Sequence, residues 1–320
     1  MSNLRQVNSV FLLGALFLLG SAIFSAGTQV YYANKVQGLD PFVFLFISFS
    51  ITIIVFSGFN HFSKSSRTFQ IKEGKKDLLY LNVSTAVAII TFYYALKYVE
   101  PAIVSAIEIG VGPLFALLLG KVLFSQKAPP AKWGIGLGIL IGSCFLFWTS
   151  LTGRSGVELG SSFHMVVGLF ASLICGFAAV YAAIYSKKLS ERGWNSTTIL
   201  AHRFYIIVPI TMLIAFGNGS MKLFIFNDLV WIVVVTLFGV ILPLYLLQLG
   251  IRVCEPFFVM ISIAFIPVFT FFFQIFDTRV QWSTGTLIGI LVLLTFAIVS
   301  VFVEHHSSGN TKERKQRGVG

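Results

Sequence analysis

Residues 95–101 read ALKYVEP and residues 250–256 read GIRVCEP, so a basic residue, two further residues and Glu-Pro occur twice in one chain. Each copy is followed by an apolar stretch with a proline near its middle, Pro113 in the first and Pro267 in the second. Chance similarity between apolar segments is the alternative explanation. Because the landmarks keep the same order in both places, we interpret the chain as two related halves.

The composition around these copies is that of a membrane protein. Of the 320 residues, 56% are apolar and only 11% are charged, and the mean hydropathy is +0.87. A soluble domain carries about 25% charged residues, because it must cover itself with solvated groups. We therefore expect lipid to surround most of this chain, and we exclude a soluble globular protein.

The apolar runs predict ten membrane-spanning helices, each long enough to cross a hydrocarbon core of about 30 Å. Turn-forming or charged residues separate them. We interpret the first run as a retained helix and not as a cleaved signal peptide, because it is long and only Arg5 precedes it. The fold class expected is an all-α membrane protein with spans at residues 8–33, 41–62, 77–97, 101–124, 132–151, 163–187, 196–216, 227–250, 256–276 and 282–304.

The distribution of lysine and arginine predicts the orientation of these spans. If the N-terminus is cytoplasmic, most basic residues lie in cytoplasmic segments, and the opposite side holds only Lys35, Lys97, Arg154, Lys222 and Arg279. Cytoplasmic loops of membrane proteins carry such an excess. We therefore expect a multi-pass protein of the cytoplasmic (inner) membrane with both termini in the cytoplasm. The net charge of +11 is explained in this way without a nucleic-acid partner.

The two halves predict an inverted repeat. With five spans each, an odd number, the second half enters the membrane upside down relative to the first. We expect residues 1–155 to form the first five-helix repeat, residues 156–305 the second, and residues 306–320 a basic cytoplasmic tail. Inverted repeats are typical of secondary transporters, in which the substrate binds near the membrane midplane between the repeats.

These residues resemble the drug/metabolite transporter (DMT) superfamily, specifically its EamA-type ten-helix branch. The resemblance is carried by YALKYVEP at residues 94–101, by GPLF at residues 112–115, and by the same pattern around Pro256 and Pro267. It implies transport of small metabolites, amino acids or amphiphilic compounds through a central cavity lined by both halves.

The chain also departs from the family pattern. Arg203-Phe204 is similar to the Arg-Phe pair often found in the second helix of each family repeat, whereas the first half has Ser48-Phe49 there. Gln126 and Thr278 stand where many members carry a glutamate. Any role that the family gives to that carboxylate is therefore left open in this chain.

Glu108 is the leading site candidate, because an ionisable residue inside a membrane span is costly and commonly functional. It precedes Pro113 by five residues, with Gly110 and Gly112 between them. Its carboxylate could bind a proton as the coupling ion or pair with a cationic substrate; the alternative is a hydrogen-bonded glutamate that fixes helix packing. Proline and glycine loosen a membrane helix, so we expect Pro113 and Pro267 to act as hinges.

Arg203 and His202 are the second candidates, since both lie inside the seventh span. Arg203 could anchor a substrate carboxylate, pair with Glu108, or fix a joint between helices. Lys97 with Glu100, and Arg252 with Glu255, lie at span ends, and we expect them to form ion pairs that fix turns.

Tyrosine and glutamine side chains form a third group of candidates. Tyrosine offers an apolar ring and a hydroxyl to a ligand, and aromatic rings attract ammonium groups. Membership of interfacial aromatic belts is the alternative. The expected substrate-binding members are Gln29, Tyr32, Tyr93, Tyr94, Tyr181, Tyr185, Tyr245 and Gln248.

Small residues recur at helical spacing in the fifth and tenth spans. Gly134, Gly138 and Gly142 form one ridge, and Gly285 and Gly289 form another. Such ridges let helices approach closely. We expect these to pack either within the bundle or in a dimer contact.

The function expected is that of a secondary transporter working by alternating access, with its site near the membrane midplane. An amino acid or a related zwitterion or amine is the favoured substrate, and export is the favoured direction. The expected partners are this small molecule, membrane lipid and, as a candidate coupling ion, the proton; the protein would be a monomer or a homodimer. We expect no cofactor, no metal and no enzymatic activity. The alternatives are a non-transporting membrane component and a membrane-embedded transferase acting on a lipid-like substrate.

Overall fold

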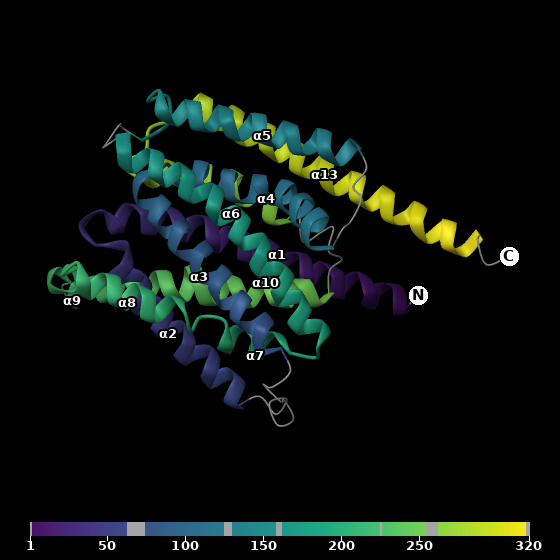
Figure 1. The fold of residues 1–320 in the computed structure, drawn as a ribbon, viewed down its shortest axis with the longest axis horizontal. Coiled ribbons are helices and arrows are strands. Elements are labelled where there is room, and N and C mark those ends of the chain that lie inside the picture. The colour runs from purple at the N-terminus through teal and green to yellow at the C-terminus, as the bar shows by residue number, and fades with distance from the viewer. Residues whose placement is uncertain are drawn as a thin grey trace.

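The computed structural model describes residues 2–62, 74–124, 130–157, 162–224, 226–253 and 262–317. In these ranges the chain is a bundle of helices joined by short linkers (Figure 1). The β-structure within them is one isolated antiparallel bridge between Val157 and Val280. The expected all-α class is therefore confirmed.

The helices follow the apolar runs of the sequence. The first part of the chain forms long helices: α1 Ser2–Lys35, α2 Pro41–Phe62, α3 Lys75–Tyr98, α4 Pro101–Phe124, α5 Pro130–Leu151 and α6 Ser162–Glu191. Shorter helices then precede a long last one: α7 Ser196–His202, α8 Ile207–Gly217, α9 Phe226–Val235, α10 Leu242–Val253, α12 Ile266–Phe273 and α13 Thr284–Arg317. Single turns of other types are η1 Val36–Gly38, η3 Ser220–Leu223, the π-helix η4 Thr236–Ile241, and η5 Gln274–Phe276.

Eight helical stretches of the described chain are long and apolar enough to cross a membrane. Two shorter apolar helices, Ser262–Phe276 and Thr284–Val299, lie within the ninth and tenth expected spans. The total of ten spans and the inverted relation of the halves stay predictions. Cys254 and the second Glu-Pro pair, Glu255 and Pro256, fall outside the described residues.

Local chemistry explains where several helices begin and end. Pro41, Pro101 and Pro130 each open a helix, a position where the missing N–H of proline costs nothing. Asn195 caps α7 by accepting a hydrogen bond from the Thr198 N–H at 2.7 Å. Gly193, with φ of +89°, turns the chain after α6 and uses a conformation that other residues adopt only at a cost.

The glycine ridge packs inside the bundle, between α5 and α13. A Cβ atom added to Gly138 would lie 2.3 Å from the Phe296 ring, and one added to Gly289 would lie 2.3 Å from Leu146. The two helices therefore touch at a distance that only glycine permits. Gly134, at one end of the ridge, has no neighbour within 4 Å of an added Cβ.

The seventh expected span is broken, which the sequence pattern did not predict. The helix stops at His202 and resumes at Ile207. Asn82 of α3 occupies the gap: its Nδ2 donates to the His202 carbonyl oxygen at 2.8 Å, and its Oδ1 accepts from the Tyr205 N–H at 2.8 Å. Backbone groups released by a break need such partners, because lipid offers none.

The two predicted hinge prolines differ in their surroundings. Pro267 lies in the first turn of α12, directly after a turn at Phe265. In contrast, α4 continues through Pro113 from Pro101 to Phe124. An interruption thus accompanies Pro267 only, and the hinge function of both residues stays a prediction.

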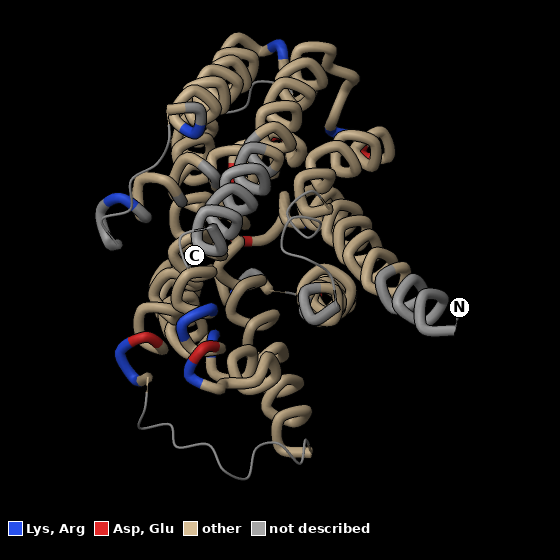
Figure 2. The backbone as a smooth tube through the Cα atoms, turned by 90° about the vertical axis from the view of Figure 1, so that its right-hand side faces the viewer, with Lys and Arg blue, Asp and Glu red and all other residues tan. Residues whose placement is uncertain are grey.

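The start of α1 and the end of α13 lie at the same end of the bundle, which we call the terminal end (Figure 1). Viewed from this end, the backbone is mostly uncharged, and its charged residues lie in a few short groups (Figure 2). The opposite end, the linker end, consists of residues 36–40, 99–100, 152–157, 218–224 and 277–283. Its segments are tied together by hydrogen bonds of Lys97 to the Leu39 carbonyl oxygen (2.9 Å), Ser220 to Asp40 (2.8 Å) and Asn34 to Asp277 (2.9 Å).

Candidate functional site

Glu108 lies where α4 and α6 cross in close contact. Its carboxyl group is hydrogen-bonded to the Cys175 side chain of α6, which also interacts with Thr91 of α3. A Cβ on Gly176 would lie only 2.7 Å from the Glu108 carbonyl oxygen, so α6 approaches α4 through a glycine. Cys175 is buried, whereas Glu108 keeps part of its surface accessible. The carboxyl group therefore has a fixed hydrogen-bonding neighbour in α6.

A second polar group lies one helical turn from Glu108. Ser105, three residues earlier on the same face of α4, donates a hydrogen bond to Oε1 of Gln29 in α1. Thr270 of α12 lies 3.5 Å from the same oxygen. The side chains of α1, α3, α4, α6 and α12 thus form one polar cluster, which we define as Gln29, Thr91, Ser105, Glu108, Cys175 and Thr270.

An aromatic layer lies beside the polar cluster. Tyr32 and Phe44 have ring centres 4.6 Å apart, Tyr32 and Tyr93 4.7 Å, and Phe44 stacks on Trp231 at 5.6 Å. The Tyr32 hydroxyl donates to the Tyr93 carbonyl oxygen at 3.2 Å. Tyr93 is also within electrostatic range of Glu108. Four expected site residues, Gln29, Tyr32, Tyr93 and Glu108, are therefore close together.

The polar cluster lies closer to the linker end of the bundle than to the terminal end. The 24 residues of α4 span about 36 Å, and Glu108 lies only about 10 Å from its first residue, Pro101. Gln29 and Thr270 are each six residues from the end of their helical segment at the linker end. The depth of a substrate site relative to the membrane midplane stays a prediction.

Arg203 does not join the polar cluster. It lies in the break between α7 and α8, where its Nε donates to Thr85 Oγ1 of α3 at 3.0 Å. Thr85 is six residues from Thr91, or about 9 Å along the helix. Among the described residues Arg203 makes no ion pair. The possible pairing of Arg203 with Glu108 is therefore not seen.

His202 is engaged in the same break. Its Nδ1 lies 2.6 Å from the Tyr205 hydroxyl, and its ring meets Trp194 edge to face at 6.0 Å. Both partners are close to His202 in the sequence, so these contacts stabilise the local conformation of the chain where α7 ends.

The remaining tyrosines are distributed over other parts of the bundle. Tyr181 and Tyr185 share one face of α6 as expected, with hydroxyls 3.3 Å apart, but their neighbour is Tyr80 near the terminal end of α3. Tyr94 packs against Tyr98. Tyr245 is 50% exposed on the outside of the bundle. The side chain of Gln248 lies outside the described part of the structure.

A cavity of about 150 Å³ lies about one helical turn from the polar cluster, toward the terminal end, and no member of the cluster lines it. Its lining includes Ser25 of α1 and Ile266 of α12, each four residues from a cluster member, Gln29 and Thr270 respectively. Residues four apart lie on one helix face, so the cavity continues along the face that carries the cluster. The rest of the lining is mostly apolar: Leu18, Ser21, Ala22, Gly239, Pro243, Leu244, Leu247 and Ile263.

Glu100 is a buried carboxylate that joins several segments of the chain, which the sequence pattern did not predict. The expected ion pair with Lys97 is wrong: Lys97 donates to a backbone carbonyl, and the Glu100 carboxylate accepts from Gly156 N–H, Gln274 Nε2 and Thr286 Oγ1. These three donors come from distant parts of the chain. No local spacing indicates them, although the Glu-Pro repeat marks the residue. The matching pair of Arg252 and Glu255 cannot be compared, since Glu255 lies outside the described residues.

Residues 12–149 match the EamA-like transporter family. Seventeen chains of solved structures match the structure of this chain. One of them, titled "Crystal structure of protein", has a TM-score of 0.60 and 16% sequence identity, and the match covers 93% of this chain and 98% of that chain. No curated protein matches the sequence. At this level of identity the structural match shows the fold, and it extends over nearly the whole chain.

Proposed function

We propose that this chain is a secondary transporter of the EamA type, from the DMT superfamily, for a small amine or zwitterion. Two findings support this: residues 12–149 match the EamA-like transporter family, and eight described helical stretches are long and apolar enough to cross a membrane. The transporter works by alternating access in the cytoplasmic membrane, with the terminal end on the cytoplasmic side. Export is the favoured direction.

The observation that carries this proposal is the position of Glu108. Its carboxyl group is hydrogen-bonded to Cys175, so this contact joins α4 of the first predicted half to α6 of the second. Movement of one half against the other would change the surroundings of this group. Transporters with repeats place their substrate sites between the repeats for this reason.

The chemistry of the cluster favours an ammonium group as the part of the substrate that is recognised. The members offer a carboxyl, an amide oxygen and hydroxyls, and Arg203 makes its contacts elsewhere. Nearby rings of Tyr32 and Tyr93 add the negative faces that attract cations. Of the favoured zwitterion and amine, the amine therefore fits better.

The nearby cavity supports an amphipathic substrate. Its mostly apolar lining could accept a small hydrocarbon group of a substrate whose polar head binds one helical turn away, at Gln29. Binding sites of this kind combine apolar walls with a few polar groups that fix orientation.

A single carboxyl group also explains how a proton could drive export. If Glu108 binds either the amine or a proton, but not both, an inward proton gradient exchanges protons for substrate. An ionisable side chain inside a membrane span is energetically costly and is commonly functional, which favours such a coupling role for Glu108.

The experiment combines ligand binding with transport. Purified protein in detergent is screened by thermal unfolding against amines, amino acids, organic acids, sugars and lysolipids, with Glu108→Gln and Arg203→Ala as matched variants. A ligand that binds only the folded state raises its stability by about 2.7 kcal/mol at a hundredfold excess over Kd. We expect an amine to stabilise the parent and Arg203→Ala, but not Glu108→Gln.

Flux in proteoliposomes with an imposed pH gradient then tests transport itself. Uptake of the stabilising amine into acidic-lumen vesicles should require Glu108. Binding without flux would favour the non-transporting alternative, and stabilisation by lysolipids alone would favour the transferase. A ligand that still binds Glu108→Gln would refute the site while leaving transport possible.

A further inference from the structure

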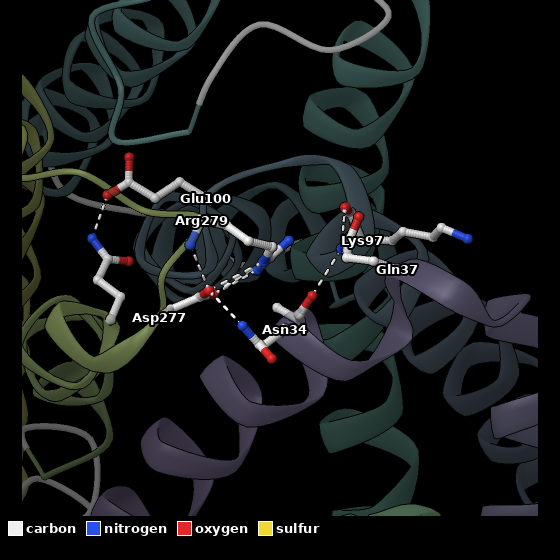
Figure 3. Close-up of polar contacts among 8 residues, drawn as sticks. Asn34, Gln37, Lys97, Glu100, Asp277 and Arg279 are labelled. Atoms are coloured by element: carbon white, nitrogen blue, oxygen red, sulfur yellow. Dashed lines mark hydrogen bonds and ion pairs between the residues drawn. The ribbon is translucent and has the colours of Figure 1, made fainter. Parts of the chain in front are cut away.

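Glu100 is a fully buried carboxylate at the linker end, with 0% of its surface exposed. Its oxygens accept hydrogen bonds from the Gly156 N–H at 2.8 Å, from Thr286 Oγ1 at 2.8 Å and from Nε2 of Gln274. Figure 3 shows Glu100 and its amide partner beside the neighbouring polar groups. The residue therefore joins the linker before α4 to three other segments: the linker after α5, the turn η5 and the first turn of α13.

The charged groups around Glu100 are engaged with other partners. Asp277 pairs with Arg279 at 2.7 Å and accepts a further bond from Asn34. Lys97 donates to Leu39. The remaining titratable or charged groups on the surrounding elements are turned to other contacts or to solvent: Lys35 over Tyr31, Asp40 with Ser220, Arg154 over Trp148, Tyr98 beside Tyr94, and His164 stacked on Tyr98. Among the described residues, then, only uncharged donors reach Glu100.

Gln274 gives Glu100 a partner in either protonation state. Its Nε2 donates to the carboxylate, while its buried Oε1 has no hydrogen-bond partner among the described residues. Rotation of the amide by 180° would turn Oε1 toward Glu100, where it could accept a bond from a protonated carboxyl. Because an amide carries both a donor and an acceptor, Gln274 can hydrogen-bond Glu100 whether the carboxyl group is ionised or protonated.

We propose that Glu100 is a proton-binding site that controls the opening of the linker end, with protonation favouring the closed form. This inference rests on the proposed alternating access, in which the linker end faces the outside and opens during transport. Opening would separate the four segments that Glu100 joins and expose its carboxyl group to water.

The sign follows from proton linkage. Burial raises the pKa of Glu100 above its ordinary value, although its three hydrogen bonds act in the opposite direction. In the open form the exposed carboxyl group regains an ordinary pKa. The closed form therefore holds a proton more tightly, so low pH favours closure, and closure weakens as the pH rises from the ordinary pKa through the raised one. Opening changes by about tenfold for each unit by which closure raises the pKa.

The test measures access to the linker end from outside. Ala33→Cys places a thiol at a fully buried position of α1, and Asn218→Cys places a reference thiol at an exposed position of a linker. Each protein in proteoliposomes is labelled with a membrane-impermeant maleimide between pH 5.0 and 8.0, and labelling of the native cysteines is subtracted. The ratio of the two rates cancels the intrinsic effect of pH on thiol reactivity.

We expect this ratio to rise with pH in the parent and to stay low and independent of pH in Glu100→Gln, which keeps the shape but is always neutral. Thr286→Val removes one donor to the carboxylate, so it should move the midpoint of the profile to higher pH; this variant decides the question alone if Glu100→Gln does not fold. His164→Gln and Asp277→Asn are the controls. Burial alone would raise the pKa of Asp277, but hydrogen bonds from Arg279 and Asn34 outweigh it and lower the pKa. Asp277→Asn should therefore keep the pH dependence. His164→Gln should keep it as well, because the described donors to Glu100 are Gly156, Gln274 and Thr286.

The outcomes separate this proposal from the transport function. A pH dependence that persists in Glu100→Gln, or a midpoint that Thr286→Val leaves unchanged, overturns the proton site while alternating access stands. Loss of the dependence in His164→Gln assigns it to the histidine and also overturns the proposal. Absence of labelling at Ala33→Cys in every variant and at every pH overturns alternating access, and the proton site with it.

Discussion

Individual charged side chains inside this bundle rely on uncharged partners. Glu108 is next to a thiol, Glu100 accepts from two side chains and one backbone N–H, and Arg203 donates to a threonine hydroxyl. An unpaired charge in lipid is costly, and hydrogen bonds recover only part of that cost. Residues held in this way are sensitive to a proton or a charged ligand, whereas a charge in a strong ion pair is not.

Arg203 gives a prediction at this scale, because its contact with Thr85 separates a structural from a substrate-binding function. A hydrogen bond to a charged group contributes about 1.5–3 kcal/mol. We expect Arg203→Ala and Thr85→Val each to lower the free energy of unfolding by that order, and the double variant to lose less than the sum. The measurement is a double-mutant cycle by thermal unfolding in detergent.

The matched cycle pairs Arg203→Ala with Glu108→Gln. Since the two side chains make separate contacts, their effects should add within about 0.5 kcal/mol. Coupling of Arg203 to Glu108 and not to Thr85 would contradict the contacts described for both residues.

Residues on neighbouring helices determine where a helix in this bundle can break and how closely two helices can pack. Asn82 supplies the two hydrogen bonds that α7 and α8 lose at their break, and Gly138 and Gly289 allow α5 and α13 to touch. In a membrane the hydrophobic effect does not favour helix–helix contact over helix–lipid contact, because lipid is as apolar as leucine. Close packing and satisfied backbone groups therefore decide which helices pair.

The glycine ridge gives a prediction at the scale of helices, with its own internal control. Gly138→Ala would bring a Cβ to 2.3 Å from the Phe296 ring, while Gly134→Ala meets nothing within 4 Å. Overpacking costs about 1–3 kcal/mol, so Gly138→Ala should lower the melting temperature measurably and Gly134→Ala should not. Phe296→Leu in the Gly138→Ala background should restore part of the loss. Equal effects at both glycines would argue against the packing of α5 on α13.

On the scale of the whole molecule, hydrogen bonds tie together the described segments of the linker end. The aromatic layer fills the bundle beneath this end, and hydrogen bonds such as Ser220 to Asp40 join its segments. Glu108 of the polar cluster lies about 10 Å along α4 from the linker end. Under the proposed orientation, a substrate could reach the outside only after these segments move apart.

A cross-link tests this at the scale of the molecule. Asp40→Cys and Ser220→Cys replace two side chains whose oxygens are 2.8 Å apart, and a short bifunctional thiol reagent should join them. We expect flux to fall to background on cross-linking, while ligand-induced stabilisation is kept, because the site can still be reached from the terminal end. Each single cysteine variant treated in the same way is the control. Unchanged flux through the cross-linked protein would show that the linker end need not open.

Much of the fold could be predicted because each membrane helix depends mainly on the composition of its own segment of sequence. A run of about 20 apolar residues is sufficient to cross the membrane, and Pro41, Pro101 and Pro130 mark helix starts without any reference to distant residues. The same local rule drew attention to Glu108, since a carboxylate stands out in an apolar run. The sequence alone therefore predicted the first six long helices, and it also singled out Glu108 as the leading candidate, whereas the break between α7 and α8 was not predicted.

Only the tertiary structure decided which of these residues lie close together. It grouped Gln29, Tyr32, Tyr93 and Glu108, held Arg203 against Thr85, and made Glu100 a junction of four segments. Partners of this kind depend on how far each helix is rotated about its axis and how deep it lies relative to its neighbours. Hydropathy determines neither the rotation nor the depth of a helix, because lipid can solvate every face of an apolar helix. Both quantities are determined by small residues and by buried hydrogen bonds between distant segments.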